Sequence, residues 1–484
     1  MNNKEKDKKV LIRINHLKQY FPVKKSSFFS QEQQYVRAND DISLDIYEGE
    51  TFGLVGESGC GKSTLGRTLL QLYEQTDGRT IYYGYSIDEF APKYVLDILE
   101  NLVSKRKSLD ELQEKEEIAY KEYESLPEGD EKYVAYEKLR VIQGQRKNLF
   151  LDITQLIGGF IVAEDLSTIS EILVKEYKTK VELQQLKKKG NKNEIDKVER
   201  ELKSIQEQIE KLKEKYNKHP KFDEYESYRD EGINLTKLTE DEMRILRKDL
   251  QLIFQDPYSS LNPRLTVGQI ISEGLFAHEM FDKRDKGIQD YILQTMEDCG
   301  LAPYFLHRYP HQFSGGQRQR IGIARSVALK PKFIVCDEAV SALDVSIQSQ
   351  IINLLLDLKE KEDLTYLFIS HDLSVIKYIS DRVGVMYLGN IVELANTEEL
   401  YMNPMHPYTE ALLSAIPTTD SDDKKEVIIL EGDIPSPIKP PSGCKFHTRC
   451  RYATEICSKV VPEFEEVRPG HFVACHHKLN NIEG

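Results

Sequence analysis

The residues best suited to chemistry form a glycine-rich segment that follows an apolar run. The segment matches the pattern GxxxxGK(S/T), and its residues are Gly56, Glu57, Ser58, Gly59, Cys60, Gly61, Lys62, Ser63 and Thr64. Glycines let backbone N–H groups close around phosphate oxygens, and a following helix points its positive end at the same charge. In this pattern the lysine reaches the outer phosphates and the hydroxyl ligates Mg²⁺. The segment therefore predicts a nucleotide phosphate site rather than a chance glycine-rich turn.

A second candidate lies at the end of the apolar run Phe333 to Cys336, where Asp337 and Glu338 follow. In a phosphate site, Asp337 would hold Mg²⁺ through water, and Glu338 would act as the general base that polarises an attacking water. A buried strand that ends in two carboxylates is also a common strand terminus. The pair alone leaves both interpretations open.

A third candidate is Ser314, Gly315, Gly316 and Gln317, at the start of a predicted helix. A hydroxyl, small residues and a helix N-terminus can together bind an anion. A serine in this position also commonly caps a helix. The segment alone is more typical of a cap than of a ligand site.

The elements that must position these residues are of mixed type. Apolar runs predict strands at 9–19, 41–55, 80–84, 333–336 and 366–370, with two short strands flanking Gly389, and globular α/β character resumes at 246–257. Helices are predicted at 63–73, within 264–305, at 314–328 and at 346–361. Residues 435–443, rich in proline, predict an irregular linker. Alternating strands and helices favour an α/β fold around the phosphate site.

A long helical segment interrupts this pattern. From roughly 88 to 237 the chain is rich in Lys, Glu, Gln and Leu, with few Gly and Pro. Its best-patterned part has a heptad seam made by Val198, Leu202, Ile205, Ile209, Leu212 and Tyr216. A second helical stretch, 94–119, could pack against that seam. The segment predicts an inserted helical hairpin or small helical domain with a solvated, charged surface.

Composition limits the possible functions. The formal net charge of the 484 residues is −14, which argues against a general nucleic-acid binder. No run of about 18 apolar residues predicts a membrane span. The N-terminus has no apolar core typical of a secretory signal. We therefore expect a soluble protein, or one held at a membrane by other subunits.

Four cysteines, Cys444, Cys450, Cys457 and Cys475, cluster near the C-terminus. Without an export signal they indicate metal binding before disulfides. Four thiolates suit an iron–sulfur cluster, Zn²⁺ is the main rival, and unliganded thiols are the third possibility. The spacing matches no paired CxxC zinc pattern, which favours the cluster.

The order of the candidates resembles the ATP-binding-cassette (ABC) family. Nineteen residues separate Gln317 from Asp337, and five separate Glu338 from Asp344. The segments that carry the resemblance are the phosphate loop, Gln255, Ser314 to Gln317, Asp337 with Glu338, Ser341 to Asp344, and His371, over about 1–87 and 238–420. This linked spacing is very specific, and it implies binding of ATP with Mg²⁺ and hydrolysis to ADP and phosphate.

The resemblance implies a role for each matching position. Gln255 would ligate and sense Mg²⁺ and couple to membrane subunits, and His371 would contact the γ-phosphate. Ser314 and Gly316, with the rest of their segment, would bind ATP held by an opposite subunit, and Asp344 would organise the seam between the two.

Two further points concern aromatic residues. In the family an aromatic residue before residue 40 stacks on adenine. Tyr35, Phe28 and Phe29 compete for that role, and Tyr35 is preferred. Phe313 departs from the family pattern, in which leucine is usual before the serine.

A closer resemblance, to oligopeptide and dipeptide importer ATPases, rests on segments 53–67, 254–264, 406–412 and 441–457. The chain resembles the F-type member of a D/F heterodimer, and some members of this group carry a 4Fe–4S cluster. The implied partners are a D-type ATPase, two transmembrane permeases and an extracellular peptide-binding protein, with no nucleic acid. The implied location is peripheral, on the cytoplasmic face of the cell membrane.

The expected fold is an ABC-type ATPase with a RecA-like α/β core, an antiparallel β part and a helical signature lobe. The expected domains are a first core segment (1–87), a helical coiled-coil insertion (88–237), the rest of the core (238–420) and a Cys-rich C-terminal domain (421–484).

The alternative is a non-transport ABC ATPase that acts on DNA or ribosomes, because coiled-coil insertions occur in that class. A single cassette, an insertion placed before Gln255, and the tail with His406-Pro-Tyr and four cysteines all favour the importer.

Overall fold

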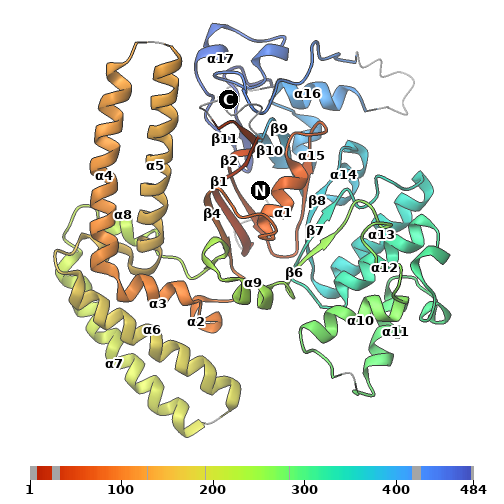
Figure 1. Ribbon diagram of the computed structural model, residues 1–484, viewed down its shortest axis with the longest axis horizontal. Coiled ribbons are helices and arrows are strands. Elements are labelled where there is room, and N and C mark those ends of the chain that lie inside the picture. Colours follow the sequence, from red (N-terminus) through yellow and green to blue (C-terminus); the bar gives the residue numbers. More distant parts are fainter. Residues whose placement is uncertain are drawn as a thin grey trace. The chain divides into compact units, whose positions relative to one another are not determined.

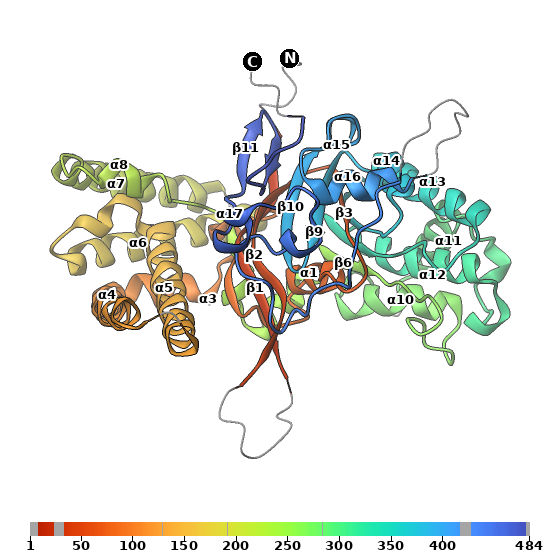
Figure 2. The ribbon, with the colours of Figure 1, turned by 90° about the horizontal axis from the view of Figure 1, so that it is seen from above.

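The computed structural model describes residues 8–23, 33–127, 129–190, 192–282, 284–416 and 427–480. The chain divides into two compact units, which Figures 1 and 2 colour along the sequence. The first unit contains residues 1–11, 15–76 and 243–484, and the second contains 12–14 and 77–242. The two units are described separately below.

The first unit is built on an eight-stranded sheet with the order β11-β12-β10-β9-β3-β8-β7-β6. Its strands are β3 (Thr51–Val55), β6 (Leu250–Ile253), β7 (Phe333–Asp337), β8 (Thr365–Ile369), β9 (Arg382–Tyr387), β10 (Asn390–Asn396), β11 (Glu465–Arg468) and β12 (His471–Val473). The five strands from β9 to β6 are parallel, and the other three continue the sheet antiparallel. Parallel strands end at the same edge, so the segments after β3, β6, β7 and β8 can meet there.

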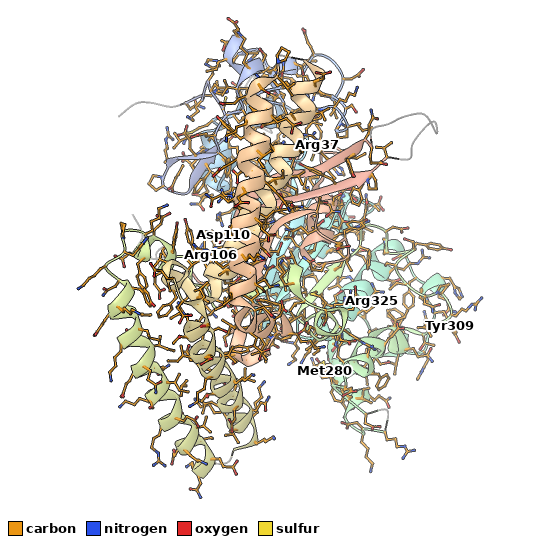
Figure 3. All side chains as sticks on the ribbon, turned by 60° about the vertical axis from the view of Figure 1, so that its left-hand side comes forward. Arg37, Arg106, Asp110, Met280, Tyr309 and Arg325 are labelled. Carbon is orange, nitrogen blue, oxygen red and sulfur yellow. The ribbon has the colours of Figure 1, made fainter. Side chains whose placement is uncertain are left out.

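The helices of this unit pack against the sheet or form a helical lobe (Figure 1). They are α1 (Lys62–Leu69), α10 (Val267–Ala277), α11 (Ile288–Asp298), α12 (Gly315–Val327), α13 (Val345–Glu362), α14 (Leu373–Ile379), α15 (Thr397–Met402), α16 (Pro407–Ser414) and α17 (Glu455–Lys459). Helix α12 packs on α10, α11 and α13. Its Arg325 (Figure 3) donates to the carbonyl of Ser260 at 2.7 Å and lies over the ring of Phe254, which ties the segment after β6 to this lobe.

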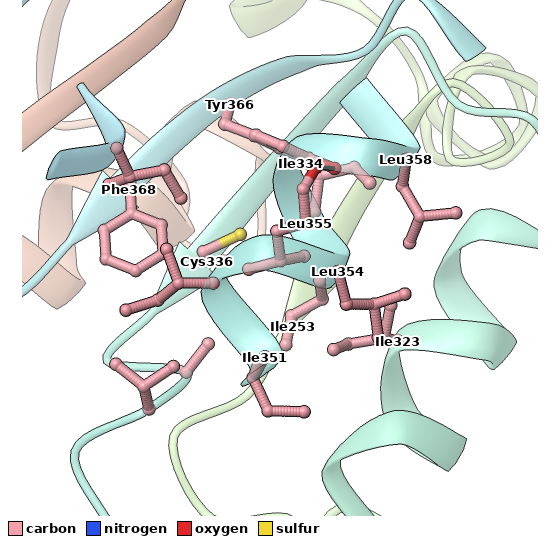
Figure 4. Packing of buried hydrophobic residues seen from close by; sticks show 14 of the residues in the cluster. Ile253, Ile323, Ile334, Cys336, Ile351, Leu354, Leu355, Leu358, Tyr366 and Phe368 are labelled. Atoms are coloured by element: carbon pink, nitrogen blue, oxygen red, sulfur yellow. Dashed lines mark hydrogen bonds between the residues drawn. The ribbon is translucent and has the colours of Figure 1, made fainter. Parts of the chain in front are cut away.

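The hydrophobic core of the first unit fills the space between the parallel strands and the helices (Figure 4). Apolar side chains of β6, β7 and β8 meet those of α13, and Ile323 joins them from α12. Tyr366 is fully buried, and its hydroxyl donates to the carbonyl of Leu355 at 3.0 Å. Since an unpaired buried hydroxyl is costly, this bond allows a tyrosine in the core.

A second sheet has the order β2-β1-β4-β5, with β1 at Val10–Pro22, β2 at Tyr35–Tyr47, β4 at Asp77–Tyr82 and β5 at Ile233–Asn234. Strands β4 and β5 pair antiparallel through Ile81 with Asn234 and Tyr82 with Ile233. Together β4 and β5 bring the two ends of the long helical segment next to each other. Helix α9 (Glu240–Leu246) then leads toward β6.

The second unit is mainly helical. Its helices are α2 (Ile87–Phe90), α3 (Lys93–Glu100), α4 (Leu102–Ser125), α5 (Asp130–Ile157), α6 (Leu166–Lys189), α7 (Lys192–Tyr216) and α8 (Phe222–Glu226), with a 3₁₀ turn, η1, at Gly158–Val162. Helix α4 packs along α5, and α6 packs along α7. On α4, Arg106 donates to Asp110 one turn later at 3.2 Å (Figure 3) and to the carbonyl of Ile161.

The heptad seam has a different partner from the one expected. Its residues Val198, Ile205 and Ile209 are buried on α7, but the helix beside them is α6 and not the 94–119 stretch. Only two residues connect α6 to α7, and helices joined by so short a connection usually pack against each other. The 94–119 stretch is itself divided at Asn101, whose side-chain amide and backbone N–H both donate to the carbonyl of Asp97, at 2.9 and 3.2 Å.

Within the described ranges, the chain has no helix that is long and apolar enough to cross a bilayer.

Candidate functional site

The glycine-rich loop between β3 and α1 has a conformation that only glycine allows at two positions. Gly56 has φ +152° and Gly61 has φ +107°. A Cβ would lie 2.2 Å from the carbonyl oxygen of Met386 at Gly56, and 2.0 Å from that of Ala38 at Gly61. Contacts this close force the backbone apart, so both glycines are needed for the loop to fit between β2 and β9.

Lys62 begins α1 and is buried, with 5% of its surface exposed. Its ammonium donates to the carbonyls of Gly56 at 2.7 Å and Glu57 at 3.0 Å. The loop carbonyls therefore hold the cation inside the curve of the loop. This is the position from which a lysine can neutralise phosphate oxygens bound by the same loop.

The next residue, Ser63, is joined to the end of β7. Its hydroxyl donates to Asp337 Oδ1 at 2.5 Å, and Arg67 donates to the other carboxylate oxygen at 3.2 Å. Asp337 is 1% exposed. A hydroxyl beside a buried carboxylate offers the hard oxygen ligands that Mg²⁺ prefers, so this pair fits the predicted magnesium site.

Three predicted residues from three different strand ends meet at one carboxylate. Gln255 follows β6, and its amide donates to Glu338 Oε2 at 2.8 Å. His371 follows β8, and its Nδ1 lies 3.5 Å from the same oxygen. Glu338 has φ +49°, a left-handed conformation that is strained for a residue with a side chain. The strained backbone and two polar neighbours direct this carboxylate toward the edge where the phosphate loop lies.

The segment Ser314 to Gln317 has the structure of a helix cap. The Ser314 hydroxyl accepts from the backbone N–H of Gln317, whose side chain accepts from the N–H of Ser314. A Cβ on Gly316 would lie 2.5 Å from Ile347 Cγ2, so glycine permits close packing of α12 on α13. Gly315 and Gly316 expose the helix start, and Asp344 precedes α13 as its exposed N-cap residue. Among the described residues, no hydrogen bond joins this segment to the phosphate loop, and its role in binding ATP from another subunit stays a prediction.

The predicted adenine-stacking residue, Tyr35, begins β2 and is 45% exposed. An exposed ring is compatible with stacking, and the assignment stays a prediction. The competing residues, Phe28 and Phe29, lie outside the described residues.

Sequence reasoning missed three residues that support the phosphate loop. The Asn39 amide donates to the carbonyl of Gly61 at 3.1 Å. The Tyr408 hydroxyl accepts from the backbone N–H of Glu57 at 2.9 Å, and Arg449 binds the Glu57 carboxylate. The resemblance of 406–412 and 441–457 to importer ATPases covered Tyr408 and Arg449 without assigning these contacts, and no local pattern identified Asn39.

The four C-terminal cysteines gather around one small cavity, which His406, Phe446, His447 and His476 also line. All four cysteines are free thiols. Burial raises the pKa of Cys475 to about 12, and it also raises the pKa of Cys444 and of Cys450. The described residues contain no group of three or more His, Cys, Asp or Glu side chains arranged to hold a metal ion. The thiols are therefore close together but not in a ligand geometry, so the structure does not support the expected iron–sulfur cluster.

Comparison with known proteins gives concordant findings. The family model "ABC transporter" matches residues 39–159 and 166–341, and "Oligopeptide/dipeptide transporter, C-terminal region" matches 392–457. The chain is 36% identical over 472 residues to the oligopeptide transport ATP-binding protein AppF of Bacillus subtilis, covering 97% of this chain and 98% of AppF. It is 34% identical over 469 residues to OppF of Salmonella typhimurium, covering 96% of each. These matches show that the chain belongs to the ABC transporter family, among the oligopeptide transport ATP-binding proteins.

Proposed function

We propose that the chain binds MgATP at the loop from Gly56 to Thr64 and hydrolyses it to ADP and phosphate, to power the import of oligopeptides and dipeptides. The observation that carries the proposal is the meeting of Gln255, Glu338 and His371 at the ends of β6, β7 and β8. Membership of the oligopeptide transport ATP-binding proteins supports peptides as the transported substrate.

In this mechanism the chain's residues bind, orient and accept a proton. The loop amides and Lys62 bind the phosphates, and Ser63 and Asp337 would hold Mg²⁺, which offsets the charge of the phosphate oxygens. Glu338 accepts the proton of the attacking water. In this proposal Gln255 senses Mg²⁺ and orients that water together with Glu338, and His371 contacts the γ-phosphate; the contacts of both residues with Glu338 support these roles.

Hydrolysis needs a second ATPase subunit in this proposal, and we infer a D-type paralogue. Support comes from Ser314 to Gln317, which expose a helix N-terminus with no hydrogen bond to the loop of their own chain in the described part. Such an end suits the γ-phosphate of ATP held by a partner.

The experiment that tests this proposal compares ATP hydrolysis by the purified chain with hydrolysis by the chain co-purified with its paralogue. We expect rapid turnover only in the complex, and loss of it on Ser314→Arg substitution. Full turnover by a chain that remains monomeric under assay conditions would overturn the proposed shared site.

The complex would act with two transmembrane permeases and an extracellular peptide-binding protein, at the cytoplasmic face of the cell membrane. Full-length similarity to transport ATP-binding proteins favours this function over action on DNA or ribosomes. ATP hydrolysis stimulated by peptide-loaded binding protein, in vesicles that contain the permeases, is the expected result.

A 4Fe–4S cluster on Cys444, Cys450, Cys457 and Cys475 is a finer proposal. Its basis is the chemistry of four soft donors that line one cavity, although the described side chains do not have a ligand geometry. When bound, such a cluster would cross-link the tail. Anaerobically purified protein should contain about four iron and four sulfide per chain. Zinc without iron would show that the cysteines form a zinc site and not a cluster, and the absence of both metals would show that they are free thiols.

A further inference from the structure

Two arginines of the Cys-rich tail flank Cys450, and they have different partners. Arg449 donates to the two carboxylate oxygens of Glu57, from Nη1 at 2.7 Å and from Nη2 at 3.0 Å. Arg451 donates to Glu410 of α16 at 3.0 Å. The Arg449 side chain therefore contacts the phosphate loop, whereas the exposed Arg451 side chain contacts α16.

The ion pair between Arg449 and Glu57 is largely shielded from solvent. The Arg449 side chain is 7% exposed and that of Glu57 is 24% exposed. The guanidinium also lies over the ring of Tyr387, 6.0 Å from its centre. A bidentate, nearly buried pair has a fixed direction, whereas the Arg451 side chain is 52% exposed and can move.

The backbone of Glu57 is held by the same part of the molecule. Its N–H donates to the hydroxyl of Tyr408 at 2.9 Å. Tyr408 packs against Tyr387 and Phe446, with ring centres 4.8 and 5.3 Å away, and all three rings are buried. The carbonyl of Glu57 accepts from Lys62 at 3.0 Å. Glu57 is therefore fixed through its side chain, its N–H and its carbonyl.

We propose that Arg449 is a positioning residue for the nucleotide site, acting through Glu57. It has two effects on the loop. The two hydrogen bonds from its guanidinium hold Glu57, so that the loop already has its phosphate-binding conformation and loses less entropy when the phosphates bind. It also neutralises a carboxylate that would otherwise repel the phosphates beside it. This inference rests on the proposed binding of ATP at the loop from Gly56 to Thr64.

The test measures the dissociation constant for MgATP on the full-length chain, and the KM and kcat of the chain in complex with its ATPase partner. Arg449→Gln should raise the dissociation constant and KM about tenfold, because hydrogen bonds to a charged group are lost and an anion is left unpaired. The value of kcat at saturating ATP should change much less, because Arg449 does not touch the reacting atoms. Arg451→Gln is the matched control and should bind MgATP like the wild type.

A double variant separates positioning from mere folding. Adding Glu57→Gln to Arg449→Gln removes the unpaired carboxylate and should recover part of the lost affinity. Arg449→Lys keeps the positive charge but loses the bidentate geometry of the guanidinium. It should weaken MgATP binding about threefold, since one of two charged hydrogen bonds is lost. The Arg449→Lys variant gives the answer if Arg449→Gln does not fold.

The proposal is overturned if Arg449→Gln and Arg449→Lys bind MgATP like the wild type. It is also overturned if Arg451→Gln weakens binding as strongly as Arg449→Gln, because the effect would then come from the tail as a whole. Lys62→Ala distinguishes failure of the ATP site itself. If Lys62→Ala binds MgATP as well as the wild type, the loop is not the nucleotide site, whatever Arg449 does.

Discussion

The phosphate-loop region of the first unit and the paired helices of the second unit are held together in different ways. In the loop region, Ser63 pairs with a residue 274 positions away, and Glu57 pairs with one 392 positions away. In the second unit, many of the ion pairs join residues close in sequence or adjacent helices, and Lys138 with Glu122 is a typical exposed pair at 2.8 Å. Distant partners make the first region sensitive to single substitutions. The second region depends on the packing of its apolar seams, because exposed ion pairs stabilise little.

The largest effect that this comparison predicts is on hydrolysis, at Glu338. Glu338→Gln should lower the ATP turnover of the complex about 10²–10⁴-fold, because an amide does not accept the proton of the attacking water. Binding of MgATP should be retained. Glu360→Gln, an exposed glutamate on α13, is the matched control and should hydrolyse normally. Turnover of Glu338→Gln within tenfold of wild type would remove Glu338 as the base.

A smaller effect, confined to the second unit, is expected at Ile205. This side chain is 1% exposed on α7, and Ile205→Ala should destabilise the paired helices by about 2–5 kcal/mol. Hydrogen exchange over 166–216 should increase, while the MgATP dissociation constant stays within about twofold of the wild-type value. Ile195→Ala, on the same helix but only half-buried, is the control. A loss of MgATP affinity in Ile205→Ala would mean that the two regions are energetically coupled.

The smallest effect on nucleotide binding is expected from removing most of the insertion. Deleting 93–229 with a short Gly-Ser connection keeps the pairing of Tyr82 with Ile233, which closes the ends of the insertion. We expect soluble protein that binds MgATP like the full chain, measured by fluorescence titration. Loss of all folded protein would show that the phosphate-loop region needs the insertion.

The candidate site could be predicted from sequence largely because its parts are locally encoded. A glycine-rich turn after a strand, a serine at a helix start and two carboxylates after an apolar strand each leave a pattern within a few residues. Their spacing, such as nineteen residues between Gln317 and Asp337, then identified the family. The meeting of Gln255, Glu338 and His371 was not predicted, and it is seen only in the structure.

The insertion was less predictable. Its helices were evident from composition and from the heptad seam on α7, because helix formation depends on neighbours three and four residues apart. The helix that packs against that seam could not be identified from the sequence, since many amphipathic helices have similar apolar faces. A periodicity argument also does not detect the break at Asn101, whose side-chain amide donates to the carbonyl and to the carboxylate of Asp97.

The sequence by itself determined the family of this protein and the phosphate-loop pattern, and it predicted which residues would hold Mg²⁺ and act as the general base. These depend on residue type and short spacing, which are visible in the chain. Only the tertiary structure decided that Arg449, and not Arg451, reaches Glu57, and that Tyr408 supports the same residue. The two arginines are alike in type and two positions apart. Which one meets the loop depends on how the buried rings of Tyr387, Tyr408 and Phe446 pack the tail against the core, a long-range packing that no local pattern records.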